Sequence, residues 1–364
     1  MEARADRGLI VFTFLLLLYG LVMVYSASSP FSLRYFHNGS YLFFKQLLAA
    51  GIGIGLLLLF SHFDYHRWQH LHDILLLGSF ILTVITLLPL PSVSNGRWLY
   101  LGPFALQPTE LLKFSLITYL ATTIVRKEEQ MKSFTEGVLP FIIVFLALAG
   151  AVIKQPDFGM VLIFGSLTAV MLFLGGARIF HLALLGIGSL PFVYLAIKTA
   201  PYRLARLLAF LNPQAYSTSS GYQIIQSLTA VGSGGITGRG LGASRAKLFY
   251  LPQSYNDFIF SITAEELGLI GAFLLIGFFV AFAWRAFAIA RQAPDRLGML
   301  LALGISFTIS VQALLNLGVS LGVLPVTGLT LPFISNGGSS LIVTLSMVGV
   351  LLNVSKQKEY PCAS

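Results

Sequence analysis

Apolar runs long enough to cross a bilayer recur along the whole chain of 364 residues. A transmembrane helix needs about 20 mostly apolar residues, because the hydrocarbon core of a bilayer is roughly 30 Å thick. The pattern predicts about ten spans, at roughly 9–27, 42–60, 72–90, 107–125, 137–153, 157–174, 177–198, 258–284, 297–318 and 338–355. The first run has no small-residue cleavage site at its end, so we expect a retained span. The fold class is therefore an all-α polytopic membrane protein.

Composition supports this fold class and adds an orientation. Charged residues make up 10% of the chain, whereas soluble domains carry about 25%. No stretch is long and polar enough to fold separately, so we expect residues 1–364 to form a single integral membrane domain. Lys and Arg outnumber Asp and Glu by 23 to 14. In a membrane protein this excess indicates cytoplasmic loops that follow the positive-inside rule, not nucleic-acid binding.

An N-terminus in the cytoplasm places about half of the 23 cations in the inside loops. An even number of spans then returns the C-terminus to the cytoplasm. The loop at about 199–257, between spans seven and eight, lies on the outer face in this arrangement. Cys362 is the only cysteine and stands in the C-terminal tail, so an internal disulfide is excluded.

The outer loop of roughly 60 residues is too long to be an idle connector. Its segment RLARLLAFLNP, residues 203–213, places Arg203 and Arg206 at i, i+3 among leucines, which predicts an amphipathic helix at the interface. Such a helix brings cations to phosphate-bearing lipid or packs on the outer ends of the spans, and both readings stay open. A second segment, residues 318–338, is rich in Pro and Gly. It predicts irregular backbone in a cavity wall, because such backbone is tolerated at membrane depth only beside protein or water.

One carboxylate stands where span eight begins. Asp257 follows a glycine-punctuated loop that carries Arg239, Arg245 and Lys247, and no other acid occurs between Asp157 and Asp257. An aspartate at this position caps a helix in many proteins. Its outer position, the cations before it and the scarcity of other acids favour a functional role, with which capping is compatible.

Other charged residues have two readings each. Glu110 and Lys113, at i, i+3 in the start of span four, predict a local ion pair or a cation for a lipid pyrophosphate. Glu265 and Glu266, about two turns into span eight, are functional candidates or partners of a neighbouring cation. Asp157 opens span six, where capping is favoured. For His62, His66 and His70, whose spacing could suit a metal, a solvated loop on the cytoplasmic side is favoured.

With these residues in view, the chain resembles the SEDS family (shape, elongation, division and sporulation), and most closely its elongation members. The matching segments, spread over most of the chain, are NGRWLYLG (95–102), QPTELLK (107–113), KQPDFG (154–159), FLNP (210–213), GYQIIQSLTAVGSGGITGRGLGASRAKLFYLP (221–252), DFIFSITAEELG (257–268) and NLGVSLGVLPVTGLTLPFISNGGSSL (316–341). The chain departs from the family pattern at Tyr255-Asn256, where His-Thr or His-Ser is usual, and at Asn336, where Tyr is usual.

The resemblance implies a peptidoglycan glycosyltransferase of the bacterial inner (cytoplasmic) membrane that polymerises lipid II for cell-wall elongation, with its active site on the outer face. The expected partners are lipid II, membrane lipid, a class B penicillin-binding protein and other membrane proteins of the elongation complex. The family's essential aspartate falls on Asp257. Its important Arg, Glu and Lys match Arg97, Glu110 and Lys113.

The implied chemistry uses Asp257 as the general base for an acceptor hydroxyl, with undecaprenyl pyrophosphate as the leaving group. Charge on the pyrophosphate would be stabilised by cations or by a divalent metal such as Mg²⁺ or Mn²⁺. The expected substrate-binding residues are Arg97, Glu110, Lys113, Arg203, Arg206, Arg239 and Lys247. The alternative functions are a lipid II flippase and a scaffold that only recruits the crosslinking enzyme.

Overall fold

The computed structural model describes residues 5–102, 104–155 and 157–357. Cys362 and both chain ends lie outside these ranges. The cytoplasmic location of the two ends stays a prediction from the sequence. Ten long helices coincide with the ten predicted spans: α1 (Arg7–Phe36), α2 (Tyr41–His62), α3 (Trp68–Ile85), α4 (Pro108–Arg126), α5 (Leu139–Lys154), α6 (Phe158–Leu174), α7 (Ile179–Lys198), α10 (Ile259–Arg291), α11 (Arg296–Ser320) and α12 (Gly338–Lys356). The all-α polytopic class is therefore confirmed.

The described residues contain eight helices that are long and apolar enough to cross a membrane. The other two of the ten are α6, a shorter apolar helix of 17 residues, and α4, which buries Glu110, Lys113 and several hydroxyl side chains. Short one-turn helices η1 (Tyr65–Arg67), η2 (Glu128–Lys132), η3 (Phe134–Val138) and η4 (Ala246–Tyr250) join some of these elements.

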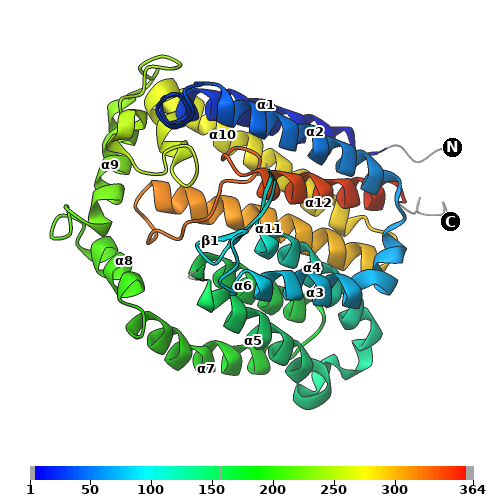
Figure 1. Ribbon diagram of the computed structural model, residues 1–364. Coiled ribbons are helices and arrows are strands. Elements are labelled where there is room, and N and C mark those ends of the chain that lie inside the picture. Colours follow the sequence, from blue (N-terminus) through cyan, green and yellow to red (C-terminus); the bar gives the residue numbers. More distant parts are fainter. Residues whose placement is uncertain (1–4, 103, 156, 358–364) are drawn as a thin grey trace.

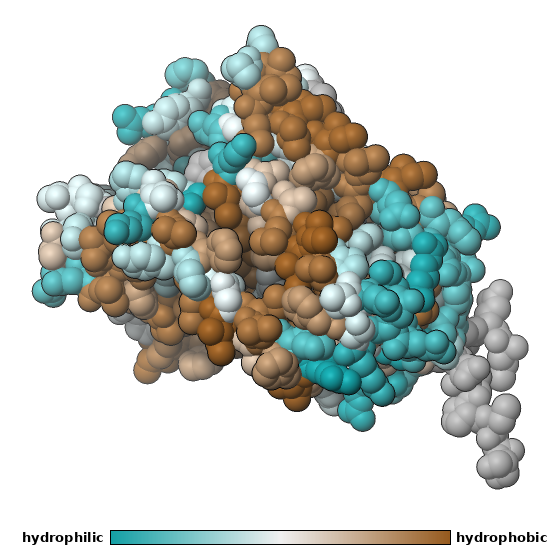
Figure 2. All heavy atoms as spheres, turned by 90° about the horizontal axis from the view of Figure 1, so that it is seen from below, coloured by the Kyte–Doolittle hydropathy of each residue, from teal (hydrophilic) through white to brown (hydrophobic). Residues whose placement is uncertain are grey.

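The helices form a bundle with α12 near its centre. Almost all of α12 is buried, and it packs against α2, α4, α10 and α11. In contrast, α7 buries only His181 of its 20 residues, and together with α8 (Pro201–Leu211) and α9 (Ser220–Ser233) it follows the rim of the bundle (Figure 1). Figure 2 shows a broad brown band of apolar side chains between more polar ends of the molecule. This band is the surface that a bilayer would cover.

Two faces lie at the ends of the bundle. We call the face with Asp6 and Asp295 the terminal face, and the opposite face, with α8 and α9, the loop face (Figure 1). The sequence correctly predicted a helix at α8. The segment between α11 and α12 is also irregular, as predicted, and its glycines Gly322 and Gly328 have positive φ.

A small antiparallel sheet on the loop face was not predicted. It consists of β1 (Val93–Ser94), β2 (Trp98–Leu101) and β3 (Phe104–Leu106), in the order β1-β2-β3. Asn95 and Gly96 form the turn between β1 and β2 with φ of 53° and 65°. Asn-Gly is a strong hairpin signal, because both residues tolerate positive φ. The turn ends at Arg97, and the hairpin therefore fixes this arginine at the loop face.

Span eight, predicted at roughly 258–284, corresponds to α10, but this helix is interrupted at Gly268. This residue has φ 65° and ψ −164°, a backbone conformation that is essentially restricted to glycine. The segment after α9 fills the interruption. Its amides at 239 and 240 donate to the carbonyls of Glu265 and Glu266, and its carbonyls at 235 and 236 accept from the amides at 269 and 270. The backbone groups freed by the break are therefore satisfied inside the protein, as membrane depth requires.

Candidate active site

Asp257 lies at the loop face, two residues before α10. The three consecutive carbonyls of Tyr255, Asn256 and Asp257 each accept a hydrogen bond, from the Asn336 amide (3.0 Å), the Ser335 hydroxyl (2.6 Å) and the Asn316 side-chain amide (2.8 Å). These donors belong to α11 and to the irregular segment that follows it. The backbone of the aspartate is therefore fixed from one side.

The carboxylate of Asp257 is not fixed in this way. Among the residues that the structure describes, no hydrogen bond reaches it, and the residue is partly exposed. Gly328 lies beside it, since a Cβ added to this glycine would stand 3.8 Å from Oδ2. Burial raises the pKa of the carboxyl to about 7, Arg206 and Arg97 oppose the rise, and the charge of Asp157 adds to it. The group therefore changes its charge near neutral pH.

Two guanidinium groups act on this carboxylate from different elements. Arg206, on α8, donates to the carbonyl of Val326 (3.2 Å) and is half-buried. Burial lowers the pKa of Arg206, while the nearby charge of Asp257 favours its protonated form. Arg97, just after the hairpin turn, donates through Nε to the carbonyl of Gln155 (2.6 Å). Both arginines were predicted from the sequence as substrate-binding residues, and the fold brings them to Asp257.

A second carboxylate lies in the same electrostatic neighbourhood. Asp157 caps α6 by accepting from the amide of Met160 (3.3 Å), as predicted, and it also accepts from the side chain of Gln107 (3.4 Å). Burial raises the pKa of Asp157, and Arg97 opposes the rise. Its proximity to Asp257 was not predicted. The segment KQPDFG, which is part of the family resemblance, was the available signal.

Glu110 and Lys113 form the local ion pair that their spacing predicts. The Lys113 ammonium lies 2.6 Å from the Glu110 carboxylate and 2.7 Å from the side-chain oxygen of Gln312, and both charged residues are buried. The charge of Glu110 contributes to the raised pKa of Asp157, so the pair lies beside the site. Contact of Lys113 with a lipid pyrophosphate stays a prediction.

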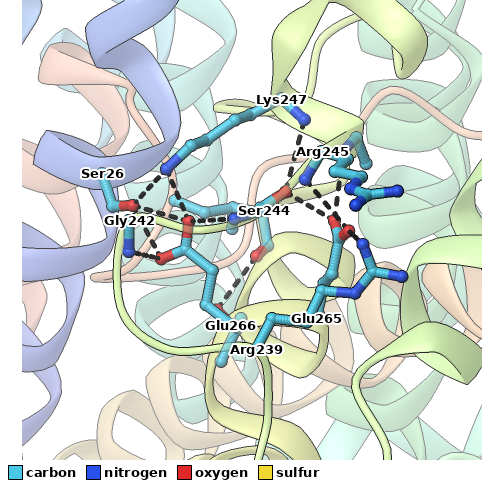
Figure 3. Close-up of polar contacts among 11 residues, drawn as sticks. Ser26, Arg239, Gly242, Ser244, Arg245, Lys247, Glu265 and Glu266 are labelled. Atoms are coloured by element: carbon cyan, nitrogen blue, oxygen red, sulfur yellow. Dashed lines mark hydrogen bonds and ion pairs between the residues drawn. The ribbon is translucent and has the colours of Figure 1, made fainter.

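The other predicted substrate-binding cations, Arg203, Arg239 and Lys247, contact protein groups other than Asp257. Arg203 donates to the carbonyls of Ala196 (2.8 Å) and Ile153 (2.9 Å). Lys247 and Arg239 form ion pairs with Glu266 (2.6 Å) and Glu265 (3.5 Å) in a second polar cluster, drawn in Figure 3. The sequence had left open whether these two acids pair with a cation, and both do.

The chemistry of the donor set is compatible with a divalent cation. Mg²⁺ is typically held by one or two carboxylates together with phosphate oxygens of a substrate, and Asp157 and Asp257 supply two carboxylates. The described residues contain no cluster of three or more His, Cys, Asp or Glu side chains suited to a metal. His66 contacts Asp64 and Asp295 on the terminal face, as part of that surface.

These features define a class: a multi-pass helical membrane protein with two carboxyl groups and two guanidinium groups gathered at one face. The chain belongs to the FtsW/RodA/SpoVE family, whose model, described as "cell cycle protein", matches residues 7–360. The resemblance to the SEDS family is therefore confirmed.

Named relatives and solved structures agree with this membership. Stage V sporulation protein E of Bacillus subtilis is 43% identical over 363 residues, which cover 99% of each chain. Probable peptidoglycan glycosyltransferase FtsW of Trichlorobacter lovleyi is 42% identical over 356 residues, which cover 97% of this chain and 93% of the relative. The structure of the rod shape determining protein RodA of Thermus thermophilus matches with a TM-score of 0.71 and 28% identity, covering 98% of each chain.

A further structural match comes from a peptidoglycan synthase complex studied for the coordination of polymerization and crosslinking. One of its chains matches with a TM-score of 0.80 and 28% identity, covering 97% of this chain and 98% of the other. These names include sporulation and rod-shape proteins. The expected elongation role of this chain therefore stays a prediction.

Proposed function

We propose that this chain is a peptidoglycan glycosyltransferase that polymerises lipid II, with Asp257 as its general base. Relatives that are about 40% identical over nearly the whole chain carry the name probable peptidoglycan glycosyltransferase. The observation that carries the catalytic assignment is the state of Asp257. Its carbonyl and the carbonyls of the two residues before it each accept a hydrogen bond, whereas no hydrogen bond among the described residues reaches its carboxylate, on which the charges of Arg206 and Arg97 act.

The acidity of Asp257 suits a general base. A base works best when its pKa lies near the operating pH, because it must be ionised and still hold a proton firmly. Burial raises the pKa of Asp257 to about 7, so a substantial fraction is ionised at neutral pH. Its partial exposure provides a route by which the proton is returned to water after each cycle.

In the proposed step, the C4 hydroxyl of the acceptor sugar gives its proton to the Asp257 carboxylate. The hydroxyl oxygen forms a bond to C1 of the lipid-linked donor with inversion. The bond between C1 and the phosphate oxygen breaks, and its electron pair leaves with undecaprenyl pyrophosphate. The leaving group departs as a stable anion, so a second acid of the kind used by glycosidases is unnecessary.

Charge on the leaving pyrophosphate needs stabilisation from fixed cations. Arg206 and Arg97 are the arginines whose charges act on Asp257, and we assign them this role. A divalent cation bound by Asp157 and Asp257 would supply further positive charge. Addition of EDTA followed by Mg²⁺ or Mn²⁺ tests this point, because a metal-dependent enzyme loses polymerisation and regains it with the ion.

The proposed setting is the inner membrane of a bacterium, with the loop face outside. The orientation rests on the positive-inside distribution of the loops. A class B penicillin-binding protein is the proposed partner, supported by the similarity to a chain of a complex that coordinates polymerization and crosslinking. Service in elongation is part of the proposal and rests on the sequence resemblance alone.

The test compares wild type with Asp257→Asn, each purified with its crosslinking partner, in a gel assay of lipid II polymerisation. We expect a loss of about 10²- to 10⁴-fold, the usual contribution of a positioned base. Glu129→Gln, an exposed acid in η2, is the matched control and should polymerise normally. Wild-type activity from folded Asp257→Asn protein would refute the assignment.

The flippase alternative needs polar groups deeper in the membrane, and Glu265 and Glu266 were its candidates. Both carboxylates are occupied by bonds within the protein, which supports chemistry at the loop face. Transport of labelled lipid II across liposomes, without polymer, would reverse this ranking.

A further inference from the structure

Glu265 and Glu266 lie in a second polar cluster that joins three segments of the chain. The two glutamates end the short half of α10, residues 259–267, just before the break at Gly268. Around them lies the loop 239–247, and α1 contributes Ser26 (Figure 3). Both carboxylates are buried, with exposures of 2% and 0%. Buried charges are costly unless they are paired and hydrogen-bonded, so their bonding has to be accounted for.

The loop binds the two carboxylates mainly through its backbone. Glu266 accepts from the amides of Gly242 (2.9 Å) and Ser244 (3.3 Å). Glu265 accepts from the amides of Arg245 (3.0 Å) and Ala246 (3.2 Å) and from the Ser244 hydroxyl (2.5 Å). Four amides within five residues thus point at two neighbouring carboxylates. Such bonds fix the loop backbone onto α10 residue by residue.

Charged and hydroxyl side chains complete the cluster. The Lys247 ammonium lies 2.6 Å from Glu266 and donates to Ser26 (2.9 Å), and Ser26 in turn donates to Glu266 (2.8 Å). Lys247 therefore connects the loop to both α10 and α1. Figure 3 shows Lys247, Ser26, Gly242 and Ser244 arranged around the Glu266 carboxylate.

This cluster and Asp257 lie at opposite ends of one short rigid element. Every residue from Phe258 to Glu266 is buried, with exposures of 3% or less. Beyond the break, by contrast, Ile270 and Phe273 are more than 60% exposed. The half-helix 259–267 is thus enclosed by protein, and the break separates it from the membrane-facing remainder of α10. A displacement at Glu265 and Glu266 would be transmitted along about 9 residues of helix toward Asp257, because backbone hydrogen bonds link the successive turns of the helix.

We propose that Glu265 and Glu266 are positioning residues for the general base, which they act on by locking the half-helix 259–267 to the loop 239–247 and to α1. The inference rests on the proposed function of Asp257. It adds that the cations Arg239 and Lys247 serve the lock and do not contact substrate. A catalytic group displaced by about 1 Å can lose on the order of 10²-fold in rate, so the lock has a kinetic consequence.

The variants are Glu265→Gln and Glu266→Gln in the full-length protein with its crosslinking partner. Each substitution keeps the side-chain shape, removes the charge and turns one acceptor into a donor. Glu266→Asp keeps the charge, and Glu129→Gln is the matched control. We expect kcat to fall at least about tenfold for Glu266→Gln with KM for lipid II unchanged, because Glu266 touches no substrate. Glu266→Asp should recover part of the loss.

Two further readouts separate positioning from mere stability. The rate should rise with pH through an acid limb near pH 7 in the wild type, because Asp257 must be ionised. In Glu266→Gln a loosened half-helix admits water to Asp257, and the limb should move to lower pH. Backbone hydrogen exchange at 255–262, measured without substrate, should accelerate in Glu266→Gln and stay unchanged in Glu129→Gln.

The outcomes distinguish the lock from the proposed function. If Asp257→Asn is inactive, and folded Glu266→Gln retains the wild-type kcat, acid limb and exchange, the lock is refuted. A loss of rate that only follows the loss of folded protein, with an unmoved limb, refutes it as well. If Asp257→Asn is fully active, the assignment of the base fails, even where exchange shows that Glu266 holds the half-helix.

Discussion

The carboxylates at the two ends of the half-helix 259–267 differ in how they are bonded. Glu265 and Glu266 accept bonds from four amides, two hydroxyls and Lys247, and Arg239 adds an ion pair. At the other end, no hydrogen bond reaches the Asp257 carboxylate among the described residues. Asp257 is partly exposed, and burial and nearby charges shift its pKa, a combination that is typical of a carboxylate at a functional site. The fully bonded carboxylates of Glu265 and Glu266 therefore indicate a structural role, whereas the carboxylate of Asp257 indicates a role in the chemistry.

The same contrast holds between the main chain and the side chain of Asp257. Three carbonyls in a row, at 255, 256 and 257, are bonded to α11 and to the segment after it. This arrangement fixes the Cα position while leaving the carboxylate to meet an acceptor sugar. Catalytic groups work best when rigid supports hold them near the productive geometry. The predictions below test whether saturated and open charges do behave differently.

The largest expected effect on folding comes from Lys247→Met. This change leaves the Glu266 carboxylate buried without its cation, and breaking a buried ion pair in this way costs about 3–5 kcal/mol. We expect a marked drop in the melting temperature in detergent. Lys132→Met, an exposed lysine in η2, is the matched control and should melt like the wild type.

The opposite pattern would break the comparison. Lys247→Met could instead have the same melting temperature as Lys132→Met but bind lipid II more weakly. Lys247 would then contact the substrate, as the sequence first predicted, and the cluster around Glu265 and Glu266 would not be purely structural.

A smaller effect is expected from Gly268→Ala. Alanine at φ 65° and ψ −164° is strained by about 1–3 kcal/mol, and its Cβ would lie 2.3 Å from the backbone nitrogen of Gly238. The loop must therefore shift away from the break. Gly277→Ala is the matched control on the same helix, since nothing lies within 4 Å of its Cβ. Equal melting curves for the two variants would show that the break is not held by the loop.

The sequence predicted the spans well, and it singled out Asp257 as a candidate. Hydrophobic runs define spans because the bilayer sets their length, and a lone acid at the end of a run is visible without any knowledge of the fold. The break at Gly268 was missed, because one glycine in an apolar run is common in transmembrane helices. The bonds from 242–246 to Glu265 and Glu266 depend on the path of a loop, which hydropathy does not encode. Arg97 could have been placed better, since the Asn-Gly turn before it signals a hairpin.

The smallest expected effect is a shift in the pH dependence of Asp157→Asn. Burial is the main cause of the raised pKa of Asp257, and the charge of Asp157 raises it further. Asparagine removes that charge but still accepts from the Met160 amide, so the α6 cap is retained. The pKa of Asp257 should then fall below about 7. Because the ionised base is the active form, the acid limb of the polymerisation rate should move to lower pH. Asp73→Asn, an exposed acid on α3, should leave the limb in place. A limb that stays or moves upward in Asp157→Asn would mean that the charge of Asp157 does not raise the pKa of Asp257. The raised pKa would then result from burial, opposed by the two arginines.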